Sequence, residues 1–111
     1  MICERWEVVV AAFPFTDLPV AKGRPALVLT PRQFNSGNGH SILAMITSAR
    51  HSRWSSDTEI ADPTSAGLRS AAIVRLKLMT LYNARISRQI GSLSDADREA
   101  VAHQLRASLP L

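Results

Sequence analysis

The sequence predicts a mostly β domain of the α+β kind, a small antiparallel barrel or rolled sheet with a C-terminal helix. Three observations support this fold class. About six short β-branched or apolar stretches are separated by Pro, Gly, Asn and Asp. One clear helical period occurs, at the end of the chain. No repeat, low-complexity segment or interdomain linker interrupts the 111 residues, so we expect residues 1–111 to form a single domain.

The expected strands are β-branched or alternating stretches of five to thirteen residues, with one shorter candidate. The first is a continuous apolar run, and Pro25 opens the second, where the missing N–H donor of proline costs nothing. The longest alternates Arg75 and Lys77 with apolar residues, a pattern typical of one solvent-facing side. Strands are expected at 7–12, 26–30, 41–48, near 58–60, at 70–82 and at 86–93.

The segments between the expected strands are rich in turn-forming residues, and a helix follows the last strand. Residues 13–23 predict an unusually apolar loop, and residues 31–40, dense in Pro, Asn, Ser and Gly, predict a turn region. The helix starts after Ser94, a favoured N-cap residue, with two aspartates in its first turn where the helix dipole favours acids. Pro110 ends it. Its apolar stripe consists of Val101, Leu105 and Leu109.

The charge balance favours an anionic partner. The formal net charge is +4 and the sequence pI about 10.2, and eleven of the thirteen cationic residues are arginine. The planar fork of arginine suits phosphate and carboxylate. An ordinary solvated surface rich in arginine is the alternative interpretation.

The single cysteine and the spread of charges indicate a cytoplasmic protein. Cys3 alone allows no internal disulfide and no cysteine-based metal site, which fits a reducing compartment. The longest stretch without Asp, Glu, Lys or Arg, residues 33–49, contains Asn, Gly and His. It therefore does not predict a membrane span.

Motifs for metal, nucleotide and triad chemistry are missing from the sequence. The three histidines, His40, His51 and His103, lack the mutual spacing of a zinc site. Neither glycine-rich phosphate loop nor G-x-S-x-G elbow occurs. We therefore expect no metal and no cofactor.

An arginine and hydroxyl groups at strand ends are the chemistry that is left. Arg24 precedes the second strand, and Thr47 and Ser48 end the third. Antiparallel pairing of these strands would place Arg24 and Thr47 on the same rim, where a guanidinium beside a hydroxyl suits phosphate. The structural alternatives are an edge charge that blunts strand pairing and a turn-forming threonine. If the phosphate belongs to RNA, the 2′-hydroxyl supplies the nucleophile.

Six motifs follow one another in order over nearly the whole chain: VVVAAFPFTD (8–17), KGRPALVLT (22–30), FN (34–35), AMITS (44–48), AGLRSAAIVRLKLMTL (66–81) and IGSLSDADREAV (90–101). In this order they resemble the MazF/PemK-like toxins of bacterial type II toxin–antitoxin systems. The resemblance implies a small SH3-like barrel with an added helix, usually a homodimer. It also implies metal-independent, sequence-selective cleavage of single-stranded RNA, chiefly messenger RNA, inhibited by a cognate antitoxin.

The resemblance assigns roles to individual residues. Arg24 matches the family's catalytic arginine and Thr47 its catalytic threonine, which implies activation of the scissile phosphate by Arg24 and hydrogen bonding to it by Thr47. The expected RNA-binding residues are Ser48, Arg75, Lys77 and Phe15. For Arg75 and Lys77, contact with the RNA backbone and simple solvent exposure are both open, and Phe15 either stacks on bases or belongs to the core.

One departure from the family leaves the proton transfers open. Some members carry an acidic residue two positions after the arginine that corresponds to Arg75, whereas here Lys77 occupies that position. Asp17 and His51 are candidates on chemical grounds. Two other functions therefore stay open: a toxin of the same barrel that acts on a protein such as DNA gyrase, and a non-catalytic RNA-binding barrel. Trp54, in a polar loop, either stacks on a base or fills a dimer interface.

Overall fold

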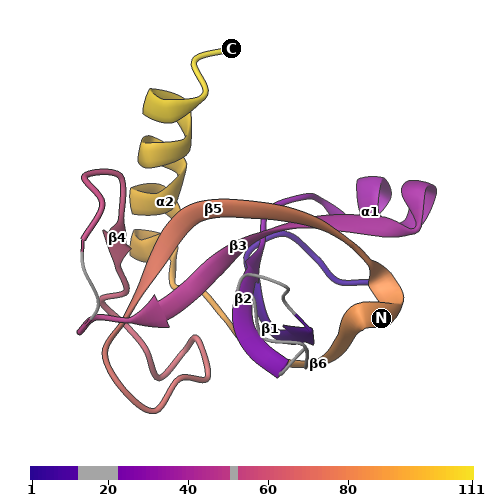
Figure 1. Cartoon of the computed structure of the whole chain (residues 1–111), viewed down its shortest axis with the longest axis horizontal. Helices are drawn as coiled ribbons and strands as arrows, with labels where there is room; N and C mark the ends of the chain where they lie inside the picture. Colours follow the sequence, from indigo (N-terminus) through magenta and orange to yellow (C-terminus); the bar gives the residue numbers. More distant parts are fainter. Residues whose placement is uncertain (13–22, 51–52) are drawn as a thin grey trace.

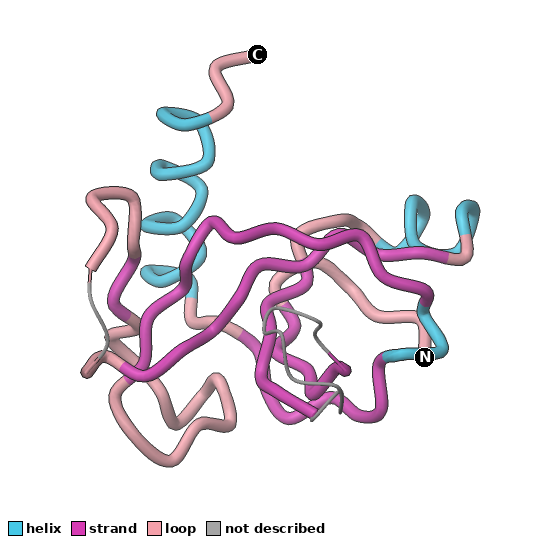
Figure 2. Tube along the Cα trace, viewed as in Figure 1, coloured by secondary structure: helices cyan, strands magenta, loops and turns pink. Residues whose placement is uncertain are grey.

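The computed structural model describes residues 1–12, 23–50 and 53–111, in which six strands form one antiparallel sheet (Figure 1). Strands dominate the trace and a long helix follows them (Figure 2), so the predicted mostly β class with a C-terminal helix is confirmed. The elements in chain order are β1 (Glu7–Ala12), β2 (Gly23–Val28), α1 (Arg32–Asn38), β3 (His40–Ser48), β4 (Thr58–Glu59), β5 (Ala72–Tyr82), the 3-10 helix η1 (Asn83–Arg85), β6 (Ile86–Ser92) and α2 (Asp95–Ser108).

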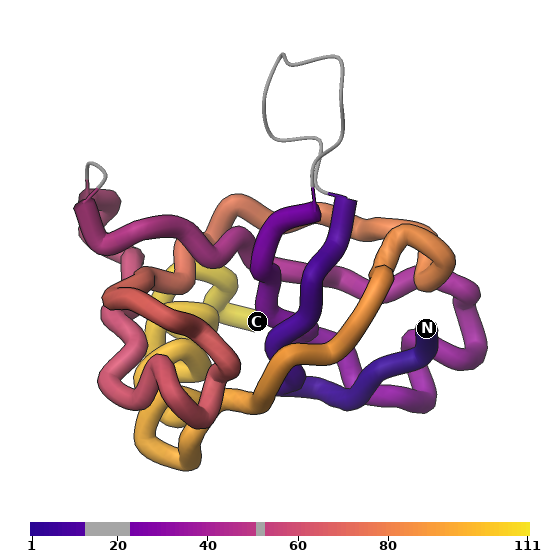
Figure 3. The backbone as a smooth tube through the Cα atoms, turned by 90° about the horizontal axis from the view of Figure 1, so that it is seen from below, coloured from indigo at the N-terminus to yellow at the C-terminus, as the bar shows by residue number. Residues whose placement is uncertain are grey.

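The sheet has the order β4-β5-β3-β2-β1-β6, so β2 and β3 lie at its centre. Neighbouring strands pair antiparallel throughout. In Figure 1 and Figure 3, β4 and α2 lie at one end of the molecule, and α1 and the N-terminus lie at the other. The long β3–β5 ribbon connects the two ends, and its register decides which side chains share a face.

Two apolar cores cover opposite faces of the sheet. The first lies between the sheet and α2, and the second lies on the other face together with Cys3. Of the predicted helical stripe, Val101 is buried and Leu105 is partly buried in the first core, whereas Leu109 is exposed. The first core includes Val8, Leu27, Ala44 and Ile46, and the second includes Val9, Ala11, Ala26, Val28 and Leu43. Alternate residues of β1, β2 and β3 thus point to opposite cores, as strand geometry requires.

The start of α2 is fixed by two side chains of its first turn. Ser94 is the N-cap, as predicted, and its side chain accepts a hydrogen bond from the N–H of Asp97 at 3.2 Å. The Asp97 carboxylate is itself buried and accepts hydrogen bonds from the N–H groups of Ala61 and Asp62 at 2.9 and 3.0 Å. These bonds join α2 to the segment that follows β4.

Residues 31–40 contain α1, so the prediction of a plain turn region there was wrong. The helix depends on Asn35, which is fully buried. Its amide nitrogen donates to the carbonyl oxygens of Cys3 and Thr30, each at 2.9 Å, and its side-chain oxygen accepts from the Thr30 hydroxyl. Gly39, with a φ of 66°, ends the helix in the left-handed conformation. Tertiary hydrogen bonds therefore stabilise a helix that local propensity does not indicate.

Strand β2 begins at Gly23, three residues before the predicted start, and Pro25 lies inside it. Pro25 is opposite Val10 of β1, whereas pairing with β3 begins only at Ala26. Proline thus occupies a stretch where the strand has one neighbour instead of two, and its missing donor removes no hydrogen bond to β3.

Candidate functional site

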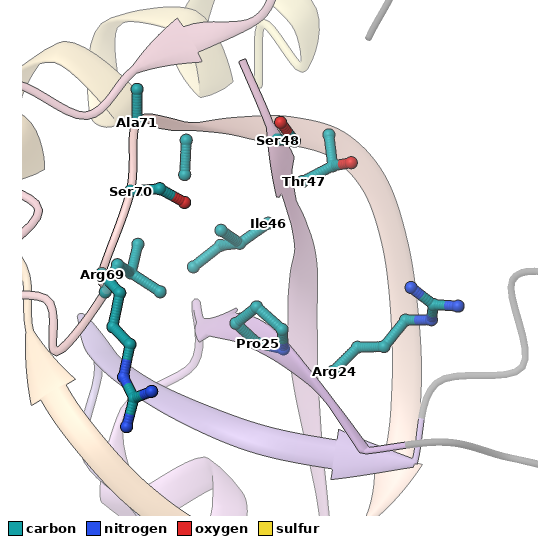
Figure 4. Close-up of a pocket in the computed structure, with 10 residues that line it drawn as sticks. Arg24, Pro25, Ile46, Thr47, Ser48, Arg69, Ser70 and Ala71 are labelled. Atoms are coloured by element: carbon teal, nitrogen blue, oxygen red, sulfur yellow. The ribbon is translucent and has the colours of Figure 1, made fainter. Parts of the chain in front are cut away.

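Arg24 and Thr47 lie on one face of the sheet, at the ends of adjacent strands. Ala26 is opposite Met45 in the β2–β3 pair, and each catalytic candidate lies two residues further along its own strand. Side chains two residues apart share a face, so the register places Arg24 across from Thr47. In Figure 4 the guanidinium and the hydroxyl turn to the same side of the two strands. The rim predicted from the sequence is present in this geometry.

A pocket of about 260 Å³ opens next to these strands, between the β2–β3 rim and the segment that leads into β5, and in Figure 4 the Arg24 guanidinium and the Thr47 hydroxyl turn away from it. A second hollow of about 300 Å³ adjoins it and adds Arg50. The first pocket is lined by Arg24, Pro25, Ile46, Thr47, Ser48, Leu68, Arg69, Ser70, Ala71 and Ala72. Every charged residue among these is an arginine, and three hydroxyl side chains accompany them. The rim therefore has the chemistry of an anion site.

Gly67 fixes the path of the segment that carries Arg69 and Ser70. Its φ is +73°, and a Cβ atom there would lie 2.0 Å from the carbonyl oxygen of Ile90. Only glycine combines this conformation with this close approach to β6. Gly91 of β6 lies on the other side of this contact, and a Cβ on Gly91 would lie 2.4 Å from the carbonyl carbon of Ala66. The two glycines hold residues 66–67 against β6, and Arg69 follows two residues later.

Arg75 is buried, so of the two interpretations left open for it, simple solvent exposure does not hold. Arg75 is 8% exposed and forms a two-point ion pair with Asp57. Its Nε donates to Asp57 Oδ1 at 3.1 Å, and its Nη2 donates to Asp57 Oδ2 at 2.9 Å. The cause is a register shift in the β3–β5 pair, where Ala44 is opposite Leu78 but Met45 is opposite Arg75. The bulge falls on β5 and changes the alternation on which the prediction depended.

Asp57 is the carboxylate that sequence reasoning missed. The β4–β5 pair places Thr58 opposite Val74, so the preceding residue falls across from Arg75. The hydrogen bond from Arg75 lowers the pKa of Asp57 below its usual value, and the backbone N–H of Trp54 and the positive charges nearby act in the same direction. The carboxylate stays ionised and holds the guanidinium in place. Here the carboxylate beside Arg75 comes from the residue before β4, and not from the position two residues after the arginine.

The other predicted RNA-binding residues lie in different surroundings. Ser48 lines both hollows, and its hydroxyl accepts a hydrogen bond from the N–H of Arg50 at 3.2 Å. Lys77 is exposed and lies in the bulge of β5. Phe15 is outside the described residues, as are Asp17 and His51. The structure thus places Arg24, Thr47 and Arg75 on one face of the sheet, with Ser48 next to Thr47 in the chain and Lys77 further along β5.

The described residues contain neither a metal-binding cluster nor a helix that could span a membrane. Within 1–12, 23–50 and 53–111, no group of three or more His, Cys, Asp or Glu side chains is arranged to hold a metal ion. No helix in the same ranges has the length and apolar character needed to cross a membrane.

The sequence matches one protein family over almost its full length. Residues 4–109 match the model of the PemK-like, MazF-like toxins of type II toxin–antitoxin systems. The chain therefore belongs to this toxin family, and the resemblance inferred from the six motifs is confirmed. Among curated proteins, no relative matches the sequence.

Solved structures with the same fold include several toxins of this kind. A chain of the MazE–MazF crystal structure (Form III) from Deinococcus radiodurans is 22% identical, with a TM-score of 0.78 and coverage of 100% of this chain and 99% of that one. The Mycobacterium tuberculosis toxin MazF-mt6 is 20% identical, with a TM-score of 0.74 and coverage of 95% and 97%. A mycobacterial endoribonuclease in complex with its cognate antitoxin is 14% identical, with a TM-score of 0.75 and coverage of 98% and 96%. At these identities the likeness shows the fold.

Proposed function

We propose that this toxin is a metal-independent, sequence-selective endoribonuclease that cleaves single-stranded RNA, chiefly messenger RNA. One observation carries the proposal: the β2–β3 register sets Arg24 across from Thr47 on one face, and both side chains turn to the same side of the strands (Figure 4). One structural neighbour is an endoribonuclease from a mycobacterial species, which agrees with this activity. The net charge of +4 favours a polyanionic substrate.

In the proposed reaction the substrate provides its own nucleophile. The 2′-oxygen attacks the adjacent phosphorus, a new P–O2′ bond forms, and the P–O5′ bond breaks. One proton leaves the 2′-hydroxyl and one is delivered to the departing O5′, so the products are a 2′,3′-cyclic phosphate and a 5′-hydroxyl. No metal-bound hydroxide is required for this attack. Asp17 and His51 are the chemical candidates for the group that takes the proton of the 2′-hydroxyl.

Arg24 and Thr47 act on the phosphate oxygens in this proposal. Negative charge accumulates on the non-bridging oxygens as the fifth bond to phosphorus forms. A guanidinium donates two parallel N–H bonds to such oxygens, and the Thr47 hydroxyl donates a third. Arg50 and Arg69, on the walls of the adjoining hollows, bind flanking phosphates and set the path of the strand. Stabilisation of developing charge is the main catalytic contribution of the rim.

A cognate antitoxin protein and a second copy of the toxin are the proposed protein partners. Two of the structural neighbours are toxins solved together with an antitoxin. An acidic antitoxin segment laid over the arginine-lined rim would compete directly with RNA. Size-exclusion chromatography with light scattering tests the homodimer, and inhibition of RNA binding by the co-expressed antitoxin tests the second partner.

The cleavage proposal is tested with a long unstructured RNA in EDTA, followed by analysis of the new ends. We expect cuts at a restricted set of sequences, each with a 2′,3′-cyclic phosphate and a 5′-hydroxyl. Thr47→Ala should slow cleavage ~100- to 1,000-fold, the usual effect of losing one donor to a developing oxyanion. Thr47→Ser retains the hydroxyl and should cut within about tenfold of the native rate, a factor equal to 1.4 kcal/mol. Equal rates for Thr47→Ala and the native protein would remove Thr47 from the mechanism.

The same assay separates the alternative functions. Intact RNA together with inhibition of DNA gyrase and growth arrest would identify a toxin that acts on a protein target. Salt-sensitive RNA binding without cleavage or growth arrest would identify a non-catalytic RNA-binding barrel. Either result would replace the proposed function.

A further inference from the structure

Trp54 is held in a fixed position although its side chain is exposed. The residue is 44% exposed, and the Arg75 guanidinium carbon lies 4.9 Å from the centre of its ring. The backbone N–H of Trp54 donates to Asp57 Oδ2 at 2.8 Å, and the N–H of Asp57 donates to the Trp54 carbonyl at 3.0 Å. The carboxylate that anchors Arg75 therefore also anchors the tryptophan backbone. The three residues form one unit, which we call the Trp54 platform.

The Trp54 platform lies on the same face of the sheet as the catalytic candidates. Arg75 is opposite Met45, and Thr47 is two residues from Met45 on the same strand. Residues two apart share a face, and the regular register from Met45 to Ser48 contains no further bulge. Diagonal neighbours on adjacent strands are about 7–8 Å apart. The platform thus borders the Arg24–Thr47 rim across the β3–β5 pair.

The chemistry around the ring favours a nucleobase as its occupant. A cation lies against the indole, and Arg50 and Arg53 precede it in the sequence within five residues. Cations interleaved with an aromatic ring are suited to a nucleic acid, because phosphates pair with the cations while a base stacks on the ring. An apolar protein contact would leave these charges facing a hydrophobic surface.

We propose that Trp54 is a stacking platform for a base of single-stranded RNA next to the scissile phosphate, a role that rests on the proposed endoribonuclease function. Arg75 supports the indole from one side, and Asp57 fixes both. Trp54 is a binding residue in this proposal, and Asp57 and Arg75 are positioning residues. The proposal predicts that Trp54 affects substrate affinity and the preference for a flanking base more than the chemical step.

Fluorescence provides the direct test, because the chain has two tryptophans. Trp6→Phe leaves Trp54 as the single reporter, and Trp54→Phe leaves Trp6 as its matched control. The probe is an RNA oligonucleotide that spans a mapped cut site and carries a 2′-O-methyl group at the cut, which removes the nucleophile. Binding should quench Trp54 in the first variant and leave Trp6 nearly unchanged in the second. Equal or absent quenching of Trp54 during saturable binding would overturn the proposal.

Kinetics with a modified substrate give an independent test. Trp54→Ala should weaken binding about 5- to 150-fold, as one stacked base contributes ~1–3 kcal/mol, and Trp54→Phe should retain most of the affinity. An abasic nucleotide beside the cut should weaken binding by the native protein similarly, but cause little further loss in Trp54→Ala. If an abasic nucleotide at every flanking position weakened binding by Trp54→Ala as much as it weakens binding by the native protein, stacking on Trp54 would be contradicted.

The controls separate this inference from the function on which it rests. If the native protein neither cuts nor binds RNA, the proposed function fails and the platform fails with it. If the native protein cuts RNA and Trp54→Ala cuts with the same KM and base preference, the platform alone is wrong. If Trp54→Ala does not fold, the quenching measured in Trp6→Phe still shows whether Trp54 stacks on a base. A Trp54 signal that changes on dilution without RNA would assign the ring to a protein contact and overturn the proposal.

Discussion

Replacement of Asp57 by asparagine tests the interpretation of the Asp57–Arg75 pair most sharply. The asparagine side chain has nearly the same shape but no charge, so Arg75 would lose its ionic partner while packing changes little. The side chains of Arg75 and Asp57 are 10% and 3% exposed, respectively. Removing one member of a buried pair leaves an uncompensated charge, which costs about 3–5 kcal/mol. Since the pair lies near the edge of the sheet, we expect the lower limit, ~3 kcal/mol.

The expected change in melting temperature follows from chain length. An unfolding entropy of about 2.1 cal/mol/K per residue gives ~0.23 kcal/mol/K for 111 residues, so Asp57→Asn should melt ~13 °C lower. Glu99→Gln is the matched control, because Glu99 pairs with Arg106 at 3.2 Å with both side chains more than half exposed. Such a surface pair contributes about 0–1 kcal/mol, so this variant should melt within ~4 °C of the native protein.

The loss of stability should depend on pH in a defined direction. The pKa of Asp57 is lowered in the folded state, so the pair contributes fully above the ordinary pKa of aspartate, about 3.9. The contribution is lost as the pH falls through the lowered pKa. Urea unfolding of both proteins from pH 7 to pH 3 should show a gap that is constant at neutral pH and narrows below ~4. A gap of under ~1 kcal/mol at pH 7, or one that widens in acid, would refute the reasoning.

Three further predictions concern the rim, the glycine contact and the helix cap. Arg69→Ala should weaken binding of single-stranded RNA and reduce the slope of log K against log salt by ~0.7, the value for the loss of one phosphate contact. Arg106→Ala, on α2, is the control and should leave the slope unchanged. Equal slopes for the two variants would show that Arg69 does not bind RNA. Gly67→Ala should destabilise the fold far more than Gly39→Ala, because both residues have positive φ but only a Cβ at Gly67 would collide with backbone atoms. Gly39→Ala should lower the free energy of unfolding in urea by about 1–2 kcal/mol. Similar losses for the two variants would contradict the close contact at Gly67. Ser94→Ala should lower the free energy of unfolding by ~1 kcal/mol, and an unchanged value would show that the Ser94 cap does not stabilise the fold.

The strand pattern and the C-terminal helix could be predicted because local signals are sufficient there. Continuous β-branched runs and a capped amphipathic helix reflect backbone preferences and burial within one segment. Helix α1 could not be predicted, because it depends on Asn35, whose amide bonds to Cys3 from a distant part of the chain. Local composition alone gives a turn for this segment.

The Arg24–Thr47 rim was predictable to the extent that it depends on simple antiparallel pairing. Arg24 and Thr47 end adjacent strands, so one assumption about pairing brings them together. The burial of Arg75 could not be predicted because a bulge in β5 changes the alternation, and a bulge has no clear signature in this sequence. Asp57 was missed because its partner is set by the register of a two-residue strand, which a single sequence does not specify.

The rate of RNA cleavage by Arg24→Ala tests the central claim most directly. Single-turnover cleavage of an oligonucleotide that contains one mapped site is followed in EDTA, beside the native protein and Arg106→Ala. The proposed role of Arg24 in stabilising charge on the phosphate predicts a loss of at least ~100-fold for Arg24→Ala, with an unchanged melting temperature and a normal rate for Arg106→Ala. Cleavage by Arg24→Ala at the native rate would contradict the assignment of this rim as the active site.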